Sequence, residues 1–396
     1  MNPYLKQLQQ IATKKKRTII GLMSGTSLDG LDIALCEIEG FGFNTRVKLK
    51  HFETLPYSVF FKNQVLSIFA KPQINFETLC LLHAYIAHEH AGMLKTMLKQ
   101  WKVNPQQVDL IASHGQTVFH APKQQHQKKA FTNATLQIGD GDHIAVKTGI
   151  ITISDFRQKH IAAGGEGAPL AAYGDSLIFT EKGKDVLLLN IGGIANFTCL
   201  HANGKITSSD TGPGNILMDG WIKENYKGHS YDKNAGKALK GKLNTPLLNA
   251  LKSDAYFKLK FPKTTGPEVF NNNFVKKALA KSKTIKISHY DILATLNRFT
   301  AETISDAFKQ LKTGKNTKLY VSGGGIHNPL LMQHLRQLNP HLSFHSTLEK
   351  NINPDAKEAV LFALLANETV CGATSVFKKA GPGFPAIRMG KISLPV

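Results

Sequence analysis

Residues 21–32 read GLMSGTSLDGLD, a glycine-rich turn between two apolar runs. Arg17 to Ile20 precede the turn and Leu31 to Leu35 follow it, so the pattern predicts a strand, a tight turn and a second strand. Glycines allow backbone N–H groups to approach an anion, and Thr26 and Ser27 add hydroxyl donors. The segment therefore predicts a phosphate-binding hairpin.

A second turn of this kind begins at Leu189 and reads LNIGGIANFT. Asn196 gives this turn a side-chain donor, and an aliphatic run from Val186 precedes it. A helical pattern from Tyr290 to Leu311 and a strand from Lys318 to Val321 follow, in the same order as a helix and a strand after the first turn. This repetition predicts a duplication, with a nucleotide held between two related domains.

The repetition also predicts the domain boundaries. We expect an N-terminal domain over residues 1–180, which carries the first hairpin, and a C-terminal domain over residues 181–380, which carries the second hairpin. Residues 381–396 form a tail that is expected to pack on the first domain. The segment 253–286 is rich in Lys, Asn, Pro and Gly and is predicted to be a surface insertion of the second domain.

Composition is that of an ordinary globular protein, since 42% of the residues are apolar. The net charge is +21, but the lysines are spread along the chain without interleaved aromatic residues, so we expect attraction of anionic ligands and no nucleic-acid partner. The four cysteines lack metal-ligand spacing and predict reduced thiols. Because no apolar run approaches the ~18 residues of a membrane span and no secretory signal is apparent, we expect a cytoplasmic protein without membrane association.

Two acidic residues accompany the first turn. Asp29 and Asp32 carry hard oxygen ligands, which could hold Mg2+ through water. A surface hairpin with an Asx turn would also explain Asp29. The adjacent small donors before Asp29 favour the functional interpretation.

A polar cluster follows the buried strand predicted at Val108 to Ala112. Residues 113–117 read SHGQT, and polar side chains at such a strand end face the crevice beyond the sheet edge in α/β proteins. His114 alone would be interpreted as a core histidine. The whole cluster, with Gln116 and Thr117, favours contact with a polar small molecule such as a sugar.

Residues 154–169 read SDFRQKHIAAGGEGAP and combine acids, a base, a cation and three glycines. Such density is costly for folding unless a ligand uses it. Asp155 or His160 could take a proton from water or a hydroxyl. Arg157 could clamp a carboxylate or a phosphate, or pair with Asp155, or both.

Three further segments lie in the second half of the chain. Residues 210–215 read DTGPGN and resemble a phosphate or metal loop, while residues 322–328 read SGGGIHN at a strand end and could pass against a purine face. Residues 354–359 read PDAKEA and begin a helix. Asp355 there favours the helix N-terminus, whereas Glu358 could reach a cleft and accept hydrogen bonds from sugar hydroxyls.

Nine ordered segments together resemble the anhydro-N-acetylmuramic acid kinase family, within the superfamily of sugar kinases, actin and heat-shock ATPases. They are GLMSGTSLDGLD, ASHGQTVFH, LQIGDG, SDFR, AAGGEGAPL, NIGGIANFT, DTGPGN, SGGGIHNP and PDAKEA. The resemblance implies an α/β fold of two duplicated actin-like, ribonuclease H-like ATPase domains that flank a nucleotide cleft.

The resemblance also implies the chemistry of the family. Water attacks the anomeric carbon of 1,6-anhydro-N-acetylmuramic acid, the anhydro bond breaks, and the released O6 takes the γ-phosphate of ATP. The product is N-acetylmuramic acid 6-phosphate, formed during the recycling of peptidoglycan. ATP and Mg2+ are the implied cofactors, a small amino sugar is the implied substrate, and a homodimer is plausible.

The resemblance assigns residues to each part of the site. The nucleotide set is Gly25, Thr26, Ser27, Leu28, Asp29, Gly30, Leu31, Asp32, Gly192, Gly193, Asn196, Asp210, Gly212, Gly214, Gly323, Gly324, Gly325 and Asn328. The substrate set is His114, Gln116, Thr117, Arg157 and Glu358, and the metal ligands are Asp29 and Asp32.

The chain departs from the family pattern near its predicted base. The family has Asp, its water-activating base, where this chain has His160, and it has Gln where this chain has Glu166. Its TGRE pattern reads TGPE here, at residues 265–268. A neutral imidazole can do the work of a base at pH 7. We therefore hypothesise that His160 and Glu166 compensate each other and form the catalytic set with Asp155.

Two alternatives to this function remain open. A kinase for another amino sugar would keep every nucleotide motif and differ only in the sugar pocket. A non-catalytic ATP switch of the same fold would need no sugar pocket, and hence no combination of His114, Gln116, Arg157 and Glu358.

Overall fold

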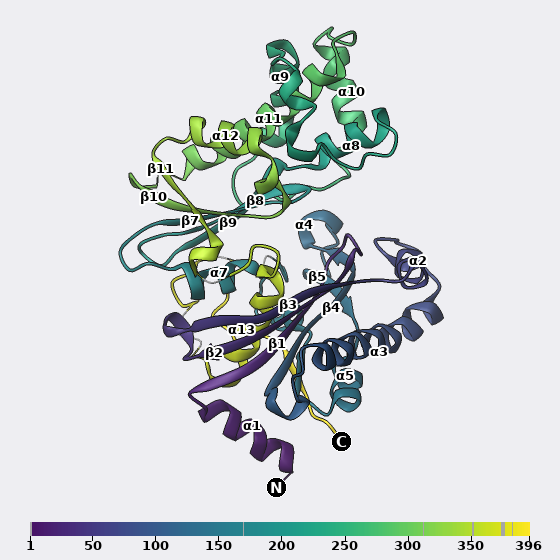
Figure 1. Ribbon diagram of the computed structural model, residues 1–396, viewed down its shortest axis with the longest axis vertical. Helices are drawn as coiled ribbons and strands as arrows, with labels where there is room; N and C mark the ends of the chain where they lie inside the picture. The colour runs from purple at the N-terminus through teal and green to yellow at the C-terminus, as the bar shows by residue number, and fades with distance from the viewer. Residues whose placement is uncertain (1, 169, 312, 351, 374–376, 382) are drawn as a thin grey trace. The chain divides into compact units, whose positions relative to one another are not determined.

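The computed structural model describes residues 2–168, 170–311, 313–350, 352–373, 377–381 and 383–396. The chain divides into two compact units (Figure 1). The first comprises Met1–Ile178 and Lys350–Val396, and the second comprises Phe179–Glu349.

The first unit is built on a seven-stranded sheet in the order β12-β6-β4-β1-β2-β3, with β5 paired to β4. The strands are β1 (Lys16–Ser24), β2 (Gly30–Glu39), β3 (Arg46–Pro56), β4 (Leu110–Ala121), β5 (Ala134–Ile138), β6 (Thr152–Ser154) and β12 (Lys391–Ser393). β1, β2 and β3 are antiparallel neighbours, whereas β4 runs parallel to both β1 and β6.

The second unit repeats this arrangement in a five-stranded sheet of order β11-β10-β7-β8-β9. Its strands are β7 (Val186–Ile191), β8 (Ile194–Leu200), β9 (Ile206–Pro213), β10 (Thr317–Ser322) and β11 (Leu342–Ser346). β7, β8 and β9 are antiparallel neighbours, and β10 runs parallel to both β7 and β11. The matching order and directions confirm the predicted duplication and the actin-like, ribonuclease H-like fold of each unit.

Helices cover both sheets. Those of the first unit are α1 (Pro3–Thr13), α2 (Val59–Ile68), α3 (Phe76–Gln100), α4 (Lys123–His126), α5 (Gly141–Thr148), α6 (Phe156–Ala162), α7 (Ala171–Phe179), which reaches the boundary, and α13 (Lys357–Cys371). Those of the second are α8 (Ile216–Asn225), α9 (Thr245–Lys252), α10 (Asn272–Lys281), α11 (His289–Gln310) and α12 (Pro329–Leu338). Within the described residues, no helix is both long enough and apolar enough to cross a membrane.

Helix α13 lies against the first sheet and explains why the observed division differs from the predicted boundary at residue 380 (Figure 1). Its apolar residues from Ala359 to Ala366 are buried. A Cβ on Gly21 of β1 would lie 1.8 Å from the Ala359 carbonyl oxygen, so only glycine permits this close packing. After α13 the tail returns to the same sheet, where β12 pairs with β6.

Contrary to the sequence-based prediction, the segment 253–286 is not confined to the surface. Tyr256, Phe270, Val275 and Leu279 from it are buried in the helical core of the second unit. The sequence pattern misled because most of the lysines between these positions face solvent, while the spaced apolar residues pack into the helical core.

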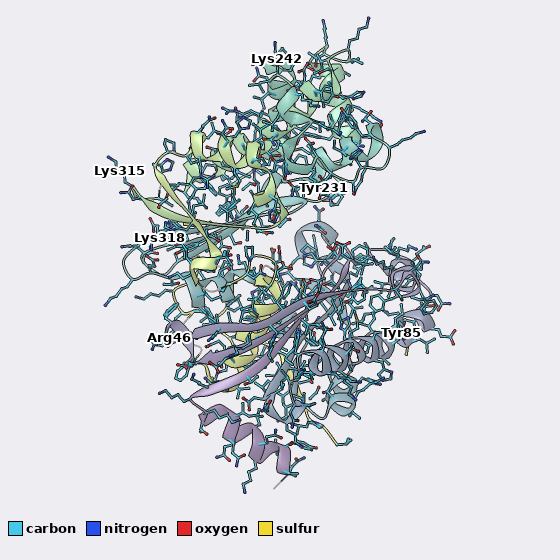
Figure 2. All side chains as sticks on the ribbon, viewed as in Figure 1. Arg46, Tyr85, Tyr231, Lys242, Lys315 and Lys318 are labelled. Atoms are coloured by element: carbon cyan, nitrogen blue, oxygen red, sulfur yellow. The ribbon has the colours of Figure 1, made fainter. Side chains whose placement is uncertain are left out.

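The labelled lysines of the second unit do not all lie in one place. Lys242 lies far from Lys315 and Lys318 in Figure 2. This spread agrees with the dispersed charge expected from the sequence.

Candidate active site

The turn between β1 and β2, here called the phosphate turn, comprises residues 25–29. The Gly25 carbonyl accepts a hydrogen bond from the Leu28 N–H at 3.4 Å, and Leu28 takes a left-handed conformation with its side chain buried. Thr26, Ser27 and Asp29 are exposed. A Cβ on Gly25 would have no neighbour closer than 3.7 Å, so the backbone here has room for an approaching anion.

The other residues assigned to this turn, Gly30, Leu31 and Asp32, differ in their burial and their hydrogen bonds. Gly30 and Leu31 are buried in the ladder between β2 and β3, so they shape the hairpin from within. Asp32 accepts a hydrogen bond from the Thr54 hydroxyl at 2.6 Å. Burial raises the pKa of Asp32, and the nearby Asp355 and Asp29 carboxylates raise it further.

Mutually repelling carboxylates of this kind suit a cation. Among the described residues, no group of three or more His, Cys, Asp or Glu side chains is arranged to hold a metal ion. Mg2+ commonly keeps several waters and binds one or two carboxylates together with phosphate oxygens. Asp29 and Asp32 fit that mode of binding.

Gln116 of β4 supports the phosphate turn from inside the protein. Its side chain is completely buried, accepts a short hydrogen bond from the Ser24 hydroxyl, and donates to the carbonyls of Gly25 at 3.3 Å and Thr117 at 3.1 Å. The Thr117 hydroxyl accepts from Gln137 at 3.1 Å and is half-buried. In this conformation Gln116 therefore contacts the turn and is out of reach of a ligand.

His114 is likewise buried and has a partner on each ring nitrogen. Nδ1 lies 3.3 Å from the Ser24 carbonyl, and Nε2 lies 3.1 Å from Nε of Arg157. Burial and then the Arg157 charge hold the pKa of His114 well below its usual range. The neutral ring therefore donates from Nδ1 and accepts from Arg157 at Nε2, which makes it a support for Arg157.

Arg157, near the start of α6, is the cation of the site. Its Nε donates to His114, and its Nη1 donates to the Gly167 carbonyl at 2.6 Å. Burial lowers the pKa of Arg157 to about 10, and the Glu358 charge opposes that shift, so the side chain remains a cation at neutral pH. These two bonds fix the guanidinium plane and leave further N–H donors for an anion.

Glu358 lies on the first turn of α13, and its side chain is exposed to solvent. Desolvation by the surrounding protein raises the pKa of the Glu358 carboxyl; the charges of Lys357 and Arg157 oppose this shift, and those of Asp32 and Asp175 add to it. Because Arg157 and Asp32 affect the pKa of Glu358, all three lie in the same region of the first unit. A solvent-accessible carboxylate beside a fixed arginine can accept hydrogen bonds from sugar hydroxyls.

His160 is buried beneath a glycine-rich loop. Its Nδ1 accepts a hydrogen bond from the Gly167 N–H at 2.9 Å, so the ring proton is on Nε2, which has no partner among the described residues by hydrogen-bond geometry. A Cβ on Gly165 would lie 2.2 Å from the imidazole Cε1, so the loop fits closely over the ring. Burial lowers the pKa of His160 to about 4, against a weaker opposing effect of the Gly383 backbone.

The lone pair on Nδ1 of His160, which a base would use, thus already accepts a hydrogen bond from the Gly167 N–H. His160 can accept a proton from water only if this N–H moves away from Nδ1. Glu166 lies half-buried in the same loop, between Gly165 and Gly167. Asp155, which has a left-handed conformation before α6, pairs with Lys391 at 2.5 Å. That ion pair takes the place of the Asp155–Arg157 pair considered from the sequence.

Buried neutral histidines make folding stability depend on pH. Burial lowers the pKa of His90 to about 3 and that of His160 to about 4, both below the ordinary 6.5. The unfolded chain therefore binds more protons below pH ~6.5, and stability falls as the pH falls. Between pH 7 and pH 5 we expect each histidine to lower the free energy of unfolding by about 2 kcal/mol.

Urea unfolding at several pH values measures this dependence. The variant His160→Asn should flatten the loss between pH 7 and pH 5. An unchanged slope in that variant would contradict the assignment of a buried, neutral His160.

The second unit gathers its assigned loops around the end of β7. The carbonyls of Gly192 and Gly193 accept from the N–H groups of Asn215 and Gly214, each at 2.8 Å. A Cβ on Gly323 would lie 2.7 Å from the Ile191 carbonyl oxygen, so this strand end packs on the same turn. Gly192 and Gly193 themselves have no neighbour within 3.5 Å of an added Cβ, and their backbone has room for an anion.

Three assigned residues of this unit have structural partners. Asn328 caps α12 by accepting from the Leu331 N–H at 3.0 Å. Asp210 accepts from the Thr265 N–H at 2.9 Å, and burial raises its pKa to about 6. Asn196 faces Asp210 across the β8–β9 ladder. Gly212 lies near the end of β9, and Gly324 and Gly325 begin a short 3-10 helix after β10.

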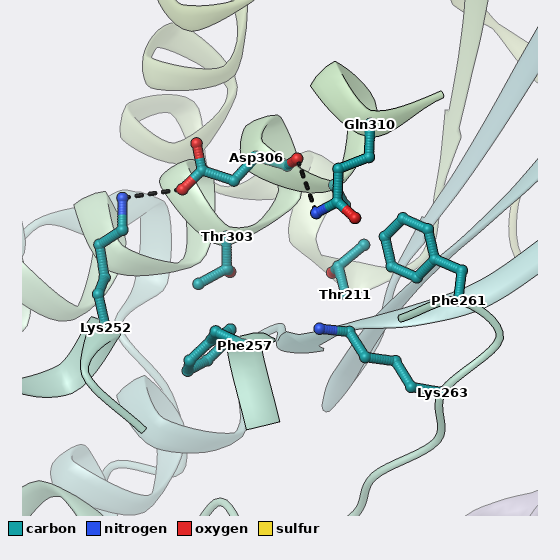
Figure 3. Close-up of a pocket in the computed structure, with 9 residues that line it drawn as sticks. Thr211, Lys252, Phe257, Phe261, Lys263, Thr303, Asp306 and Gln310 are labelled. Atoms are coloured by element: carbon teal, nitrogen blue, oxygen red, sulfur yellow. Dashed lines mark hydrogen bonds and ion pairs between the residues drawn. The ribbon is translucent and has the colours of Figure 1, made fainter. Parts of the chain in front are cut away.

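A small cavity near β9 and α11 is drawn in Figure 3. Its volume is about 60 Å³, and Thr211, Phe261, Lys263, Thr303 and Gln310 are among the residues that line it. The Lys263 ammonium donates to the Tyr256 carbonyl at 3.1 Å, and burial lowers its pKa. A cavity of this size admits water and excludes a sugar or a nucleotide.

Sequence reasoning missed the residues that support the site. Tyr57 is buried and donates a hydrogen bond to the Ser24 hydroxyl, and the buried His90 is bonded to the Tyr57 hydroxyl. Asp175 of α7 pairs with Lys357 at 2.9 Å, next to Glu358. These residues lie in ordinary apolar patterns, so no local motif marks them.

Comparisons with known proteins identify the family of the chain. The family model described as "Anhydro-N-acetylmuramic acid kinase" matches residues 17–392. Proteins of that name from Pseudoalteromonas translucida and Pseudoalteromonas atlantica are 51% and 50% identical, with 99% and 100% of both chains covered. One from Caldanaerobacter subterraneus is 36% identical over 98% of this chain and 100% of its own.

Solved structures match at lower levels. A ROK family glucokinase from Streptomyces griseus has 12% identity and a TM-score of 0.37, with 87% of this chain and 98% of that chain covered. Likeness at this level supports no conclusion about function. The full-length family match and the close relatives show that the chain belongs to the anhydro-N-acetylmuramic acid kinase family.

Proposed function

We propose that this protein is an ATP-dependent kinase that opens the 1,6-anhydro ring of 1,6-anhydro-N-acetylmuramic acid and phosphorylates O6. The product is N-acetylmuramic acid 6-phosphate, in the recycling of peptidoglycan. The observation that carries the proposal is the fixed Arg157, close enough to Glu358 for each charge to shift the pKa of the other, in the same unit as the open phosphate turn. Family membership supports it.

The residues divide the work as follows. Arg157 binds the lactyl carboxylate of the sugar, and Glu358 accepts hydrogen bonds from its hydroxyls. His114 and Gln116 hold Arg157 and the phosphate turn in place. Water adds at the anomeric carbon, its proton passes to the base, and the C1–O6 bond breaks so that O6 can accept the phosphoryl group.

The cofactors of the proposal are ATP and Mg2+. The open backbone at Gly25, Gly192 and Gly193 fits phosphate groups, and Asp29 and Asp32 fit a hydrated Mg2+. When bound, ATP supplies the phosphoryl group and Mg2+ neutralises its developing charge.

Incubation with ATP, Mg2+ and a panel of anhydro and free amino sugars tests the proposal. ADP release and the product mass are measured for each sugar. We expect a sugar phosphate only with the anhydro-muramic sugar. A phosphate on a free amino sugar alone would support the other kinase, and ADP release without any sugar phosphate would exclude both kinases.

The base of the proposal is His160, with Glu166 and Asp155 as supporting acids. Since Gly167 occupies Nδ1 of His160, the loop must shift when substrate binds. We expect His160→Ala to lower kcat about 100-fold, with the KM for the sugar little changed, because the base acts after binding. Steady-state kinetics of His160→Ala, Glu166→Gln and Asp155→Asn measure the three roles.

Retention of full kcat by His160→Ala, with Glu166→Gln inactive, would move the role of base to Glu166. Rescue of His160→Ala by added imidazole would support His160. Lys159→Ala is a control, since Lys159 is exposed on the same helix.

A cytoplasmic location and a homodimer complete the proposal. Family membership supports both. Sedimentation analysis of the purified chain measures its assembly.

A further inference from the structure

A chain of buried hydrogen bonds ends at the phosphate turn. The Tyr57 hydroxyl lies 2.9 Å from Nε2 of His90 and 2.7 Å from the Ser24 hydroxyl. The Ser24 hydroxyl in turn donates to Oε1 of Gln116. All four side chains are buried, and none of the sequence motifs includes Tyr57 or His90.

The direction of this chain follows from its last member. Gln116 donates both of its amide hydrogens to backbone carbonyls, so its Oε1 accepts from Ser24. Tyr57 then donates to Ser24, and His90 must donate to Tyr57 from Nε2. Burial lowers the pKa of His90 to about 3 and raises the pKa of Tyr57, so both stay neutral and every proton has one position.

Tyr57 also holds the other end of the same turn. Its backbone N–H donates to the Asp29 carbonyl at 3.3 Å, immediately after β3 ends at Pro56. The phenol therefore fixes the residue before the turn, and the amide fixes its last residue. These two contacts of Tyr57, with Ser24 and with Asp29, are here called the tyrosine clamp. Stacking of Tyr57 on Phe61, with ring centroids 4.0 Å apart, anchors the tyrosine clamp to α2.

The same chain reaches the sugar-binding side. The Ser24 carbonyl lies 3.3 Å from Nδ1 of His114, whose Nε2 accepts from Arg157. Ser24 thus contacts both the tyrosine clamp and the support of Arg157. A shift of the Ser24 hydroxyl would displace the phosphate turn, whereas Arg157 keeps its own bonds to His114 and Gly167.

We propose that Tyr57 is a positioning residue that sets the geometry of the phosphate turn through Ser24 and Gln116. This inference rests on the proposed function only for its kinetic readout. Loss of the phenol leaves Ser24 without its donor, so the turn samples other positions and holds the nucleotide phosphates less well. Arg157 keeps its bonds to His114 and Gly167, so sugar binding changes less.

The variant Tyr57→Phe tests the proposal, because it keeps the ring on Phe61 and removes one hydroxyl. We expect the KM for ATP to rise about 10-fold and kcat to fall, with the KM for the sugar within twofold of the original. Hydrogen exchange of the amides in residues 24–30 should become faster. Ser24→Ala should give the same pattern.

Tyr85→Phe is the matched control, because Tyr85 also packs on Phe61 but lies on the half-buried face of α3 (Figure 2). It should leave the KM for ATP and the exchange unchanged. An unchanged KM for ATP and unchanged hydrogen exchange in Tyr57→Phe would overturn the proposal. A lower melting temperature would also overturn it if the KM for ATP did not rise relative to the KM for the sugar. If the original chain phosphorylates no sugar, the proposed function fails, while ADP titration and hydrogen exchange still test Tyr57.

Discussion

Replacement of Arg157 by lysine is expected to lower kcat/KM for the anhydro sugar about 100-fold. The guanidinium uses Nε and Nη1 for His114 and Gly167, and it presents its remaining donors in a fixed plane. Lysine keeps the charge but cannot bond to both supports and to a carboxylate at once. Most of the loss in kcat/KM should therefore occur in Arg157→Lys, although this variant keeps the positive charge.

Steady-state kinetics with varied sugar and saturating ATP measure this effect. Arg46→Lys is the control, because Arg46 is exposed on β3 of the same unit (Figure 2). It should leave kcat/KM unchanged. Activity of Arg157→Lys within a few-fold of the original would mean that charge alone suffices and that the planar fork has no role.

Glu358→Gln is expected to produce the second large effect, a loss of about 100-fold in kcat/KM for the sugar. The carboxylate only accepts hydrogen bonds, whereas the amide places N–H donors against hydroxyl donors and beside the Arg157 cation. The fold should hold, because the side chain is exposed and the two residues have the same shape.

The dependence of kcat/KM on pH provides a second test of Glu358. Since its surroundings raise the pKa of Glu358, the carboxylate takes up a proton at a higher pH than an ordinary glutamate. The kcat/KM should fall as the pH is lowered through that raised pKa, and this acid limb should be absent in Glu358→Gln. Glu77→Gln, which also removes an acid from the first turn of an exposed helix end, is the control. An acid limb that persists in Glu358→Gln would assign it to another group.

The fold was readily predicted because its signals are local. The two glycine turns each lie between apolar strands, and the repeat of strand, helix and strand identified the duplication. The division at residue 350 was not predictable in this way, because it depends on the packing of α13 against β1. Gly21 permits that contact, but a glycine in a strand does not reveal which distant helix approaches it.

The candidate site was predictable in its residue types and less so in their roles. His114 and Gln116 were expected just beyond a strand that ends at Ala112, as polar ligand contacts commonly are, yet β4 continues through both residues and their side chains are buried. His160 was chosen as a base from its alignment with the family acid, and its Nδ1 proved to be bonded to Gly167. Roles of this kind depend on hydrogen-bond direction, which has no sequence pattern.

The reaction in water enriched in oxygen-18 tests the central claim most directly. The claim is that this chain adds water at the anomeric carbon and transfers phosphate to O6. Mass spectrometry within minutes should find a sugar phosphate with one heavy oxygen on C1 and none in its phosphate; product incubated afterwards in the same water gives the exchange baseline. A sugar phosphate labelled only at that baseline, or heavy inorganic phosphate without a sugar phosphate, would contradict the claim.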